Sequence, residues 1–600
     1  MNLSKGKPIK DHIFGDLDQP SNSVRWLIDR HCGVHHYHEM TPKRPKPSES
    51  VELYVSTSMD LNVESVMVWI TTDDWKHHSV QQLSQQRPIW STALWSYLQE
   101  WVITLPPQPV GTMLRYKIGA KLQGSSKVVY ADSQSEDSET ATHFSIFFGE
   151  DALPEWAEKA VIYQIFVDRY NPGGDRSWDS QSDLKQPFGG TLLGITEKLP
   201  FIKAMGFNTI WLTPIFGSPT HHGYDTSDYY QIHPRLGSMN DFMELIRVAH
   251  QHKIRVLLDF VANHCSSEHP YFQDALTNPE SPYLDYFVWK KWPHYESFYN
   301  VRTMPKLNLA YGSPAREYLL KCAQYWLKTG VDGFRLDYAH GPEQDFWVDF
   351  RRACAAVNPA VWTFAEIVQP PDVQASYVDG VGGALDFLLC QALRLTFGQF
   401  EWPLEKFAAF LQNHFDYFPE DFSLPAFLDN HDMNRFLVTS ELGEKLLKLA
   451  LLVLYTQPGP PIVYYGTEVA LSQRQSIHAK GAQGFDEARL PMDWDAVEKS
   501  DLPRYLAKLA EIRQAYPSLY QFSWKLFSSG EHRDFIVLSK TGKESLYLVI
   551  NRSENSITWR LEEIAHRVFV DLVMDERYMV ADEQSTLIVE PYSAMLLSAK

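Results

Sequence analysis

The stretch IRVLLDFVANH (254–264) indicates the fold, because it is a short, almost continuous apolar run that ends in polar and ionisable side chains. The segment SMNDFMELIRVAHQHK (238–253) directly precedes it and has the amphipathic spacing of a surface helix. A strand with apolar side chains on both faces, next to such a helix, is typical of a parallel sheet covered by helices on both sides. We therefore predict a helix and a buried parallel strand here.

Seven further apolar runs of this kind alternate with longer amphipathic segments. They are AVIYQIF (160–166), NTIWLTP (208–214), GVDGFRLD (330–337), AVWTFAE (360–366), ALDFLL (384–389), SLPAFLD (423–429) and PIVYYG (461–466). Eight such strands over about 350 residues fit a closed barrel better than an open sheet. We predict an α/β fold with a (β/α)8 TIM barrel over residues 151–517.

Two regions flank the barrel, and a third region interrupts it. Residues 1–150 contain short, aromatic-rich runs such as VELYVSTS (51–58) separated by polar turns, which predicts an N-terminal β-sandwich. Short strand-like runs return over 518–600 and predict a C-terminal β-sandwich. The segment 265–312, after the third strand, is too long for an ordinary loop, so we predict a small inserted subdomain there.

The composition excludes several classes of protein. Of the 600 residues, 44% are hydrophobic and 22% are charged, which is ordinary for a globular chain and unlike a disordered or fibrous one. The 74 acidic residues outnumber the 55 Lys and Arg residues, and the net charge is −19. A partner rich in phosphate requires the opposite sign, so we expect no nucleic acid to bind.

We also expect no membrane association. The apolar stretch LLKLALLVLY (446–455) is about half as long as a bilayer span, which takes about 20 residues, so we predict a buried helix. The start MNLSKGKPIKDHIF (1–14) has no apolar run behind its positive charges and does not resemble a secretory signal. The five cysteines show neither metal-ligand nor disulfide spacing. We expect a cytoplasmic location.

Ionisable side chains follow four of the predicted strands. They are Asp259 and His264 after the third strand, Arg335 and Asp337 in the fourth, Glu366 after the fifth, and His431 and Asp432 after the seventh. Each has an ordinary explanation by itself, such as a helix N-cap for an aspartate or a salt bridge for an arginine. The carboxyl ends of barrel strands meet at one face, however, and active sites of this fold lie there. Four strands with this feature therefore favour an active site.

Several carboxylates without a metal-ligand cluster favour glycoside hydrolysis, in which one carboxylate attacks and a second donates a proton. We predict that Arg335 lowers the pKa of Asp337 and keeps this nucleophile ionised. Glu366 has apolar neighbours in sequence, and burial there raises the pKa of a carboxyl, as a proton donor requires. Neighbouring strands lie about 4.8 Å apart, close to the carboxyl separation of about 5 to 5.5 Å in retaining enzymes.

Three more side chains complete this hypothesis. Asp432 provides a third acid, which we expect to hold sugar hydroxyls and to favour a distorted sugar ring. His264 and His431 are hydrogen-bond donors that suit the same sugar.

At this point the chain resembles a known family. The motifs DFVANH (259–264), GFRLD (333–337), AE (365–366) and FLDNHD (427–432), in this order, resemble the four signature regions of the α-amylase family of retaining glycoside hydrolases. HGYDTSDYY (222–230) is similar to a region of that family near the second strand, and MPKLN (304–308) resembles a fifth region found in its neopullulanase, cyclomaltodextrinase and maltogenic amylase branch. The resemblance covers the barrel and the C-terminal region well, and residues 1–150 only in outline.

The resemblance implies a role for seven residues. The catalytic ones are the nucleophile Asp337, the acid/base Glu366 and the transition-state stabiliser Asp432. The substrate-binding ones are Tyr224, His264, Arg335 and His431.

The resemblance also implies an activity. We expect a retaining α-glucan hydrolase that cleaves α-1,4 bonds of maltooligosaccharides, cyclodextrins, pullulan or starch through a covalent glycosyl-enzyme intermediate. Two alternatives stay open at this stage: a glucanotransferase or α-1,6-cleaving relative with the same catalytic residues, and, more remotely, a non-catalytic carbohydrate-binding protein. The branch implies a homodimer formed through the N-terminal domain.

The chain departs from the family pattern at three places. After Asp337 it reads Tyr-Ala-His-Gly (338–341), where the branch usually has Asn-Glu in the last two positions, on the acceptor side of the site. Ala365 replaces the usual glycine before Glu366. Thr191 stands where calcium-binding relatives carry aspartate, and NPGGDRSWD (171–179) offers few carboxylates. No cofactor is required by this chemistry, and we predict no metal ligand, although calcium stays open.

Overall fold

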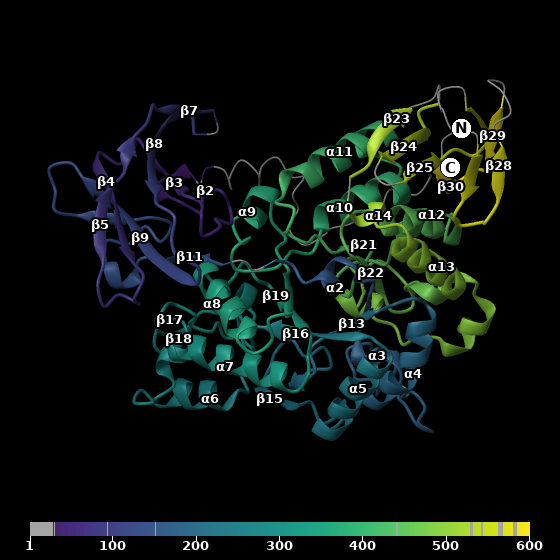
Figure 1. The fold of residues 1–600 in the computed structure, drawn as a ribbon. Coiled ribbons are helices and arrows are strands. Elements are labelled where there is room, and N and C mark those ends of the chain that lie inside the picture. The colour runs from purple at the N-terminus through teal and green to yellow at the C-terminus, as the bar shows by residue number, and fades with distance from the viewer. Residues whose placement is uncertain are drawn as a thin grey trace.

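The computed structural model of the protein has a central barrel with a strand-rich region at each side (Figure 1). It describes residue 28 and residues 31–92, 94–149, 152–179, 181–439, 442–521, 523–528, 532–541, 544–561, 568–579 and 585–599. The first predicted segment, 1–14, lies outside these residues. The limits that we predict between the domains, at 150 and 517, stay predictions.

Seven parallel strands form the central sheet, in the order β20-β19-β16-β13-β12-β22-β21. They are β12 (Ile162–Ile165), β13 (Thr209–Leu212), β16 (Arg255–Val261), β19 (Gly333–Asp337), β20 (Trp362–Ala365), β21 (Ala426–Phe427) and β22 (Pro461–Tyr464). Each of them is part of a predicted apolar run. The parallel register places the carboxyl ends of the strands at one face, where the site lies.

The prediction of a sixth strand over 384–389 is wrong for most of its length. Only its start is extended: Ala384 makes a parallel bridge to Ala365, and the neighbouring Gly383 makes one to Ser423. These backbone contacts join β20 to the segment before β21 and close the ring. Asp386 caps helix α10 (Phe387–Leu393) by accepting a hydrogen bond from the Leu389 N–H, so the chain turns into a helix where its apolar run predicts a strand.

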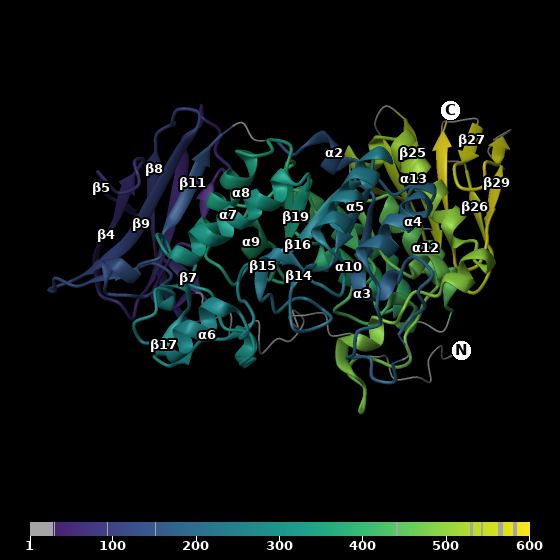
Figure 2. The same cartoon turned by 90° about the horizontal axis from the view of Figure 1, so that it is seen from below.

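Helices connect the strands and cover the outside of the barrel (Figure 2). The longer ones are α4 (Leu192–Ala204), α5 (Met239–Gln251), α7 (Pro314–Lys328), α8 (Gln344–Ala355), α11 (Leu404–Tyr417), α12 (Glu444–Tyr455) and α13 (Leu502–Ala515). Shorter helices are α2 (Glu155–Glu158), α3 (Val167–Tyr170), α9 (Pro371–Ala375) and α14 (Ser518–Gln521). The helix predicted over 238–253 is confirmed as α5, which begins at a capping box of Ser238 and Asp241. The buried helix predicted over 446–455 is confirmed as part of α12.

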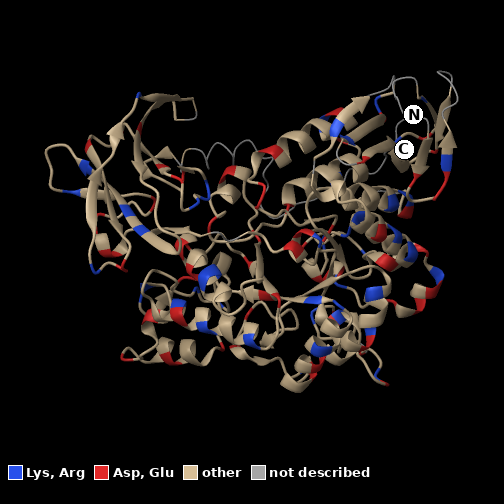
Figure 3. Cartoon of the chain, in the orientation of Figure 1, with Lys and Arg blue, Asp and Glu red and all other residues tan. Residues whose placement is uncertain are grey.

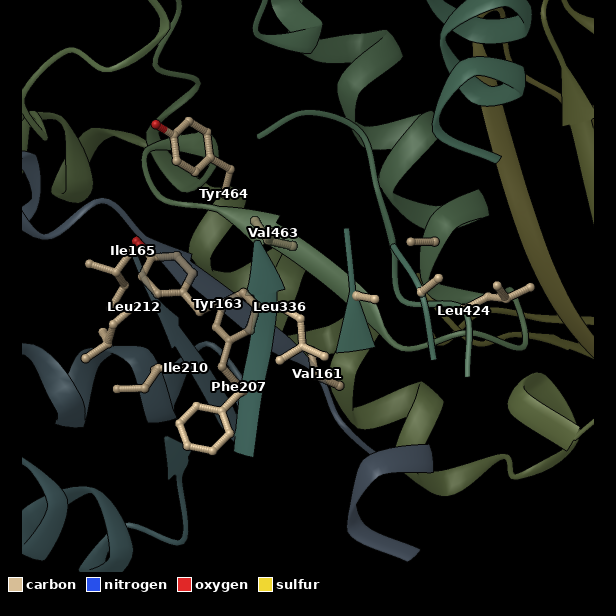
Figure 4. Packing of buried hydrophobic residues seen from close by; sticks show 14 of the residues in the cluster. Val161, Tyr163, Ile165, Phe207, Ile210, Leu212, Leu336, Leu424, Val463 and Tyr464 are labelled. Carbon is tan, nitrogen blue, oxygen red and sulfur yellow. The ribbon is translucent and has the colours of Figure 1, made fainter. Parts of the chain in front are cut away.

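Alternate residues of the barrel strands pack on opposite sides. Ile162, Trp211 and Leu257 belong to a compact cluster that fills the barrel between the strands. The residues that alternate with them, including Tyr163 and Ile210, belong to a larger cluster shared with the surrounding helices (Figure 4). Both faces of each strand are therefore buried, which explains why these strands are apolar at almost every position.

The segment after β16 forms the predicted insertion. It contains α6 (Pro270–Thr277), the antiparallel pair β17 (Trp289–Lys291) and β18 (His294–Tyr295), and short helical turns at Leu284–Tyr286 and Phe298–Asn300. Its last part returns to the barrel, where the Leu307 N–H donates to the Asn263 carbonyl at 3.0 Å. A second antiparallel pair, β14 (Phe216–Gly217) and β15 (Asp228–Ile232), follows β13.

The N-terminal region is a β-sandwich, as predicted. One sheet contains β1 (Val34–His35), β2 (Met40–Thr41), β3 (Val51–Ser58), β6 (Ser84–Gln85), β7 (Ile89–Ser91) and β8 (Ser96–Leu105). The other contains β4 (Val63–Thr71), β5 (Ser79–Gln82), β9 (Thr112–Leu122), β10 (Val128–Tyr130) and β11 (Phe144–Phe148). Apolar side chains of both sheets share one core. Arg115 on β9 joins this region to the barrel through a 2.7 Å ion pair with Asp349 on α8.

The C-terminal region also contains two sheets with a common core. The larger contains β23 (Lys525–Ser528), β24 (Phe535–Thr541), β25 (Ser545–Asn551), β27 (Val568–Asp571), β28 (Arg577–Met579) and β30 (Ser593–Ala599). The smaller pairs β26 (Ile557–Arg560) with β29 (Thr586–Val589). Acidic and basic residues are interspersed over the part of the chain that the structure describes (Figure 3). Within the residues described, no helix is long and apolar enough to cross a bilayer.

Candidate active site

One arginine holds the carboxyl groups of three neighbouring strands. Arg335 Nη1 donates to Asp337 Oδ1 at 2.8 Å and to Asp259 Oδ1 at 2.7 Å, and its Nη2 forms a 2.8 Å ion pair with Glu366 Oε2. The strand register explains this arrangement, because Asp259 pairs with Arg335 and Leu336 pairs with Ala365. Asp337 and Glu366 are the next residues on the two strands. The two carboxyls therefore lie side by side at the mouth of the barrel.

Glu366 is buried against the chain that follows the nucleophile strand. The Tyr338 N–H donates to Glu366 Oε2 at 2.9 Å, and the Glu366 N–H donates to the Leu336 carbonyl at 2.9 Å. Burial raises the pKa of Glu366, although the Arg335 guanidinium opposes this effect. The direction agrees with our prediction for this carboxyl, and it favours a protonated group that can donate.

We predicted that the pKa of Asp337 is lowered, and this direction is wrong. Burial raises the pKa of Asp337 well above its ordinary value, and the carboxyls of Glu366, Asp259 and Asp432 raise it further. Arg335 lowers it, but this single cation is shared by several carboxyls. Because Asp337 and Glu366 interact strongly, they titrate as one pair.

A second cluster faces this pair from the loops after β13 and β21. The Tyr224 hydroxyl donates to Asp259 Oδ2 at 2.9 Å and lies 2.5 Å from His431 Nε2. Gln164 Nε2 donates to His431 Nδ1 at 2.8 Å. His431 Nε2 lies 3.0 Å from Asp432 Oδ2. Tyr224 and His431 also stack, with ring planes 5° apart.

Arg489 is a residue of this cluster that sequence analysis did not identify. Its Nη2 donates to Asp432 Oδ1 at 2.7 Å and its Nε donates to the His431 carbonyl at 2.8 Å. Burial favours the neutral form of Asp432, but His431 and Arg489 outweigh it and hold the pKa of this carboxyl below its ordinary value. Arg489 directly follows a 3-10 turn (Gly484–Ala488) in the long segment after β22, and no motif in the sequence points to it. Asp432 is thus an ionised acid beside a pair whose pKa values are raised.

His264 connects the barrel mouth to the insertion. Its Nε2 lies 3.1 Å from the Tyr224 carbonyl, and its ring stacks on Phe298 with centroids 4.4 Å apart. Burial lowers the pKa of His264 to about 4, so the imidazole is neutral at physiological pH. The structure thus brings all seven predicted site residues to one mouth.

The loop considered for calcium contains an arginine of its own. Arg176 donates to the Thr191 hydroxyl at 3.1 Å and to the Gly173 carbonyl at 3.2 Å, and the Thr191 hydroxyl donates to the Pro172 carbonyl at 2.9 Å. Oxygens that bind a guanidinium and each other do not fit a calcium site. No group of three or more His, Cys, Asp or Glu side chains in the described ranges could hold a metal ion.

The family model described as "Alpha amylase, catalytic domain" matches residues 164–516.

The chain belongs to the α-amylase family.

A cyclomaltodextrinase from Geobacillus thermopakistaniensis is 30% identical over 585 residues, which cover 92% of this chain and 96% of that protein. Neopullulanase 2 from Thermoactinomyces vulgaris is 31% identical over 470 residues, which cover 74% and 78%. A solved cyclomaltodextrinase structure has a TM-score of 0.69 and 25% identity, and the match covers 95% of this chain and 99% of that one. This α-amylase family member is a glycoside hydrolase of the cyclomaltodextrinase and neopullulanase type.

Proposed function

We propose that this glycoside hydrolase cleaves α-1,4 bonds of α-glucans with retention of configuration, through a covalent glycosyl-enzyme intermediate. The observation that carries this proposal is the contact of Arg335 with both Asp337 and Glu366. One guanidinium cannot contact two carboxyls that lie far apart. Their closeness favours direct attack by one of them over an inverting mechanism, in which a wider gap must hold a water molecule.

In the first step, an Asp337 oxygen attacks the anomeric carbon, and the bond from that carbon to the glycosidic oxygen breaks. Glu366 transfers its proton to the departing oxygen, so the leaving sugar departs as a neutral alcohol. The product is an ester between Asp337 and the remaining sugar. Burial of Glu366 supports its role as the donor, since it favours the protonated form that this step uses.

In the second step, a water molecule attacks the same carbon from the side that the leaving sugar vacated. Glu366, now ionised, accepts a proton from this water, and the ester bond to Asp337 breaks. In both steps positive charge develops on the sugar ring, and the ionised Asp432 stabilises it electrostatically. His431 and Arg489 support this role because both contact Asp432 and hold its carboxyl ionised.

The substrates that we propose are maltooligosaccharides, cyclodextrins, pullulan and starch. The names of the relatives support this range, because they include cyclomaltodextrinase, neopullulanase and maltogenic α-amylase. We also propose a cytoplasmic location, since two relatives from Bacillus subtilis are named intracellular maltogenic amylase. A homodimer formed through the N-terminal sandwich stays a prediction from the resemblance.

Product analysis tests this function. We would incubate the pure protein with maltotriose, β-cyclodextrin, pullulan and starch, resolve the products, and record the first anomer formed by proton NMR. We expect shorter α-glucans whose new reducing end is initially in the α form. An initial β anomer would contradict retention, and well-folded protein that leaves every glucan intact would contradict the function itself.

A trapping experiment tests the intermediate. A 5-fluoro glycosyl fluoride slows the second step, so the sugar should stay on the enzyme and add its mass to the peptide that contains Asp337. The Asp337→Asn variant is the matched control and should stay unlabelled. A label on any other carboxyl would contradict the assignment of the nucleophile.

A further inference from the structure

A buried glutamine of the first barrel strand contacts the candidate active site. Gln164 lies in β12, a strand that contains none of the seven predicted site residues, and it is fully buried. Its Nε2 donates to His431 Nδ1 at 2.8 Å. Among the residues that the structure describes, its Oε1 has no hydrogen-bond partner. The bond to His431 is therefore the only hydrogen bond of this carboxamide within the described part of the chain.

The strand directs this side chain into the barrel. Tyr163 and Ile165, on either side of Gln164, belong to the cluster that the barrel shares with the surrounding helices (Figure 4). Because alternate residues of a strand point to opposite faces, Gln164 shares the inner face with Ile162. Its backbone pairs with β13 on one side and with β22 on the other. The carboxamide thus extends from a part of the chain that hydrogen bonds hold on both sides.

The imidazole of His431 needs such a fixed partner. It belongs to the segment after β21, a strand of only two residues. Tyr224 stacks on the ring with planes 5° apart, and Trp211 lies edge-on to it with centroids 6.0 Å apart. These ring contacts fix the plane of the imidazole, but they do not distinguish its nitrogen atoms from its carbon atoms. The contacts of Gln164 at Nδ1 and of Asp432 at Nε2 make that distinction.

The orientation of His431 matters for Asp432. Its Nε2 lies 3.0 Å from Asp432 Oδ2, and His431 is one of the groups that hold this carboxyl ionised. A half-turn of the ring about its Cβ–Cγ bond would put Cε1 in the place of Nε2 and Cδ2 in the place of Nδ1. A carbon atom cannot accept the hydrogen bond from Gln164 Nε2. The carboxamide therefore disfavours the turned ring, in which Asp432 would lose its contact with Nε2.

We propose that Gln164 is a positioning residue that keeps His431 turned with Nε2 toward Asp432 during the reaction. This inference rests on the proposed function, in which Asp432 stabilises the positive charge that develops on the sugar ring. Orientation of Asp432 acts mainly in the transition state, because that charge is absent from the bound substrate. Its loss therefore lowers kcat more than it raises KM. Gln164 acts through His431 and needs no contact with the sugar.

Replacement of Gln164 by methionine tests the proposal, because methionine has a similar length and donates no hydrogen bond. For Gln164→Met we expect kcat on maltotriose to fall about tenfold and KM to change less than about twofold, as for the loss of one positioning hydrogen bond. Gln164→Glu keeps the length and a polar group that can bond to His431 Nδ1, so it should recover most of the lost kcat.

Gln457→Met is the matched control. Gln457 is also fully buried, and its Oε1 also has no hydrogen-bond partner within the described ranges, but its Nε2 donates to the Val453 carbonyl at 2.7 Å, in its own segment. This variant should keep the kcat of the wild-type protein even where its thermal stability falls as much as that of Gln164→Met.

A double-mutant cycle tests whether Gln164 acts through His431. In a His431→Ala background, Gln164→Met should lower kcat by no more than about a further twofold, because the ring that it orients is gone. With α-maltosyl fluoride, an activated substrate, the rates of slow variants stay measurable. If circular dichroism shows that Gln164→Met does not fold, Gln164→Asn replaces it, since this shorter carboxamide stays polar but does not reach Nδ1.

The outcomes separate this proposal from the proposed function. Normal kcat in a folded Gln164→Met variant, a rise in KM alone, a full tenfold further loss in the His431→Ala background, or an equal loss of kcat in Gln457→Met would overturn the positioning role and leave the proposed function intact. Wild-type protein that turns over neither maltotriose nor α-maltosyl fluoride would overturn both.

Discussion

The backbone N–H of Tyr338 donates to Glu366 Oε2 at 2.9 Å, so the residue after one catalytic strand holds the carboxyl that follows the next strand. This bond depends on the left-handed conformation of Tyr338 and on the register of β19 and β20. It orients Glu366 while burial raises the pKa of the carboxyl. The segment that bears the nucleophile, β19 with Tyr338 directly after it, therefore also positions the proton donor of the proposed mechanism.

The first prediction concerns the nucleophile. Asp337→Asn keeps the size of the side chain and removes the attacking oxygen anion, so we expect kcat on maltotriose to fall by about three orders of magnitude or more. Asp416→Asn changes an exposed aspartate at the end of α11 and is the control that should keep its activity. Steady-state kinetics measure the change, and circular dichroism checks the fold. Near-normal turnover by folded Asp337→Asn would refute the assigned role.

The second prediction separates the proton donor from the nucleophile. Glu366→Gln cannot protonate a leaving sugar, but fluoride departs with little need of a proton. We expect kcat/KM for maltotriose to fall at least about a hundredfold more than that for α-maltosyl fluoride. Asp337→Asn should impair both substrates alike, because both need the nucleophile. If Glu366→Gln lost both activities equally, Glu366 would not be the acid.

The third prediction concerns pH. The reactive form of the pair contains one proton, with Asp337 ionised and Glu366 protonated, so kcat/KM should be bell-shaped. Because burial raises the pKa of both carboxyls, both limbs should lie above the pKa of about 4 that free carboxyls have. Activity falls below the lower limb because Asp337 is protonated, and above the upper limb because Glu366 is ionised. In Glu366→Gln, the upper limb should disappear with α-maltosyl fluoride; its persistence would assign it to another group.

The fourth prediction concerns Arg489. Replacing it by methionine leaves the half-buried Asp432 and the buried Asp486 without the guanidinium that contacts both. Loss of one partner of a buried ion pair costs about 3–5 kcal/mol of unfolding free energy, which urea denaturation measures. We also expect kcat to fall, since Asp432 loses a contact that orients it. Arg247→Met removes an exposed pair with Glu244, which solvent screens, and should leave the urea midpoint almost unchanged. An equal cost in the two variants would contradict the prediction.

The fifth prediction concerns Gly341. A methyl group there would press on Asn263, whose Nδ2 lies 3.2 Å from His264 Nδ1. We expect Gly341→Ala to cost about 1–3 kcal/mol in unfolding free energy and to raise KM for maltotriose, because it displaces His264. Adding Asn263→Ala to this variant removes the clash with Asn263 and leaves the contact of 2.7 Å with the Tyr338 ring, so the double variant should be more stable than additivity predicts. Strict additivity would show that the methyl group meets no resistance from Asn263.

Sequence alone was sufficient for the architecture and for the residues that gather at the barrel mouth. Apolar runs such as IRVLLDF (254–260) identify strands buried on both faces, and this signal is local. Once the strands are parallel, their ends must meet, so Asp337, Glu366 and Asp432 could be placed together. The run ALDFLL (384–389) shows the limit of that signal, because a buried helix and a buried strand have the same apolar pattern.

The tertiary structure alone decided the electrostatics and the partners of these residues. Arg335 stands two residues before Asp337 in sequence, but in the fold it is shared with Asp259 and Glu366, and burial reverses the predicted direction of the Asp337 pKa. Arg489 approaches Asp432 from a loop after another strand. The physical reason is that Coulomb interactions and desolvation depend on distance and burial in space, and spacing along the chain does not contain that information.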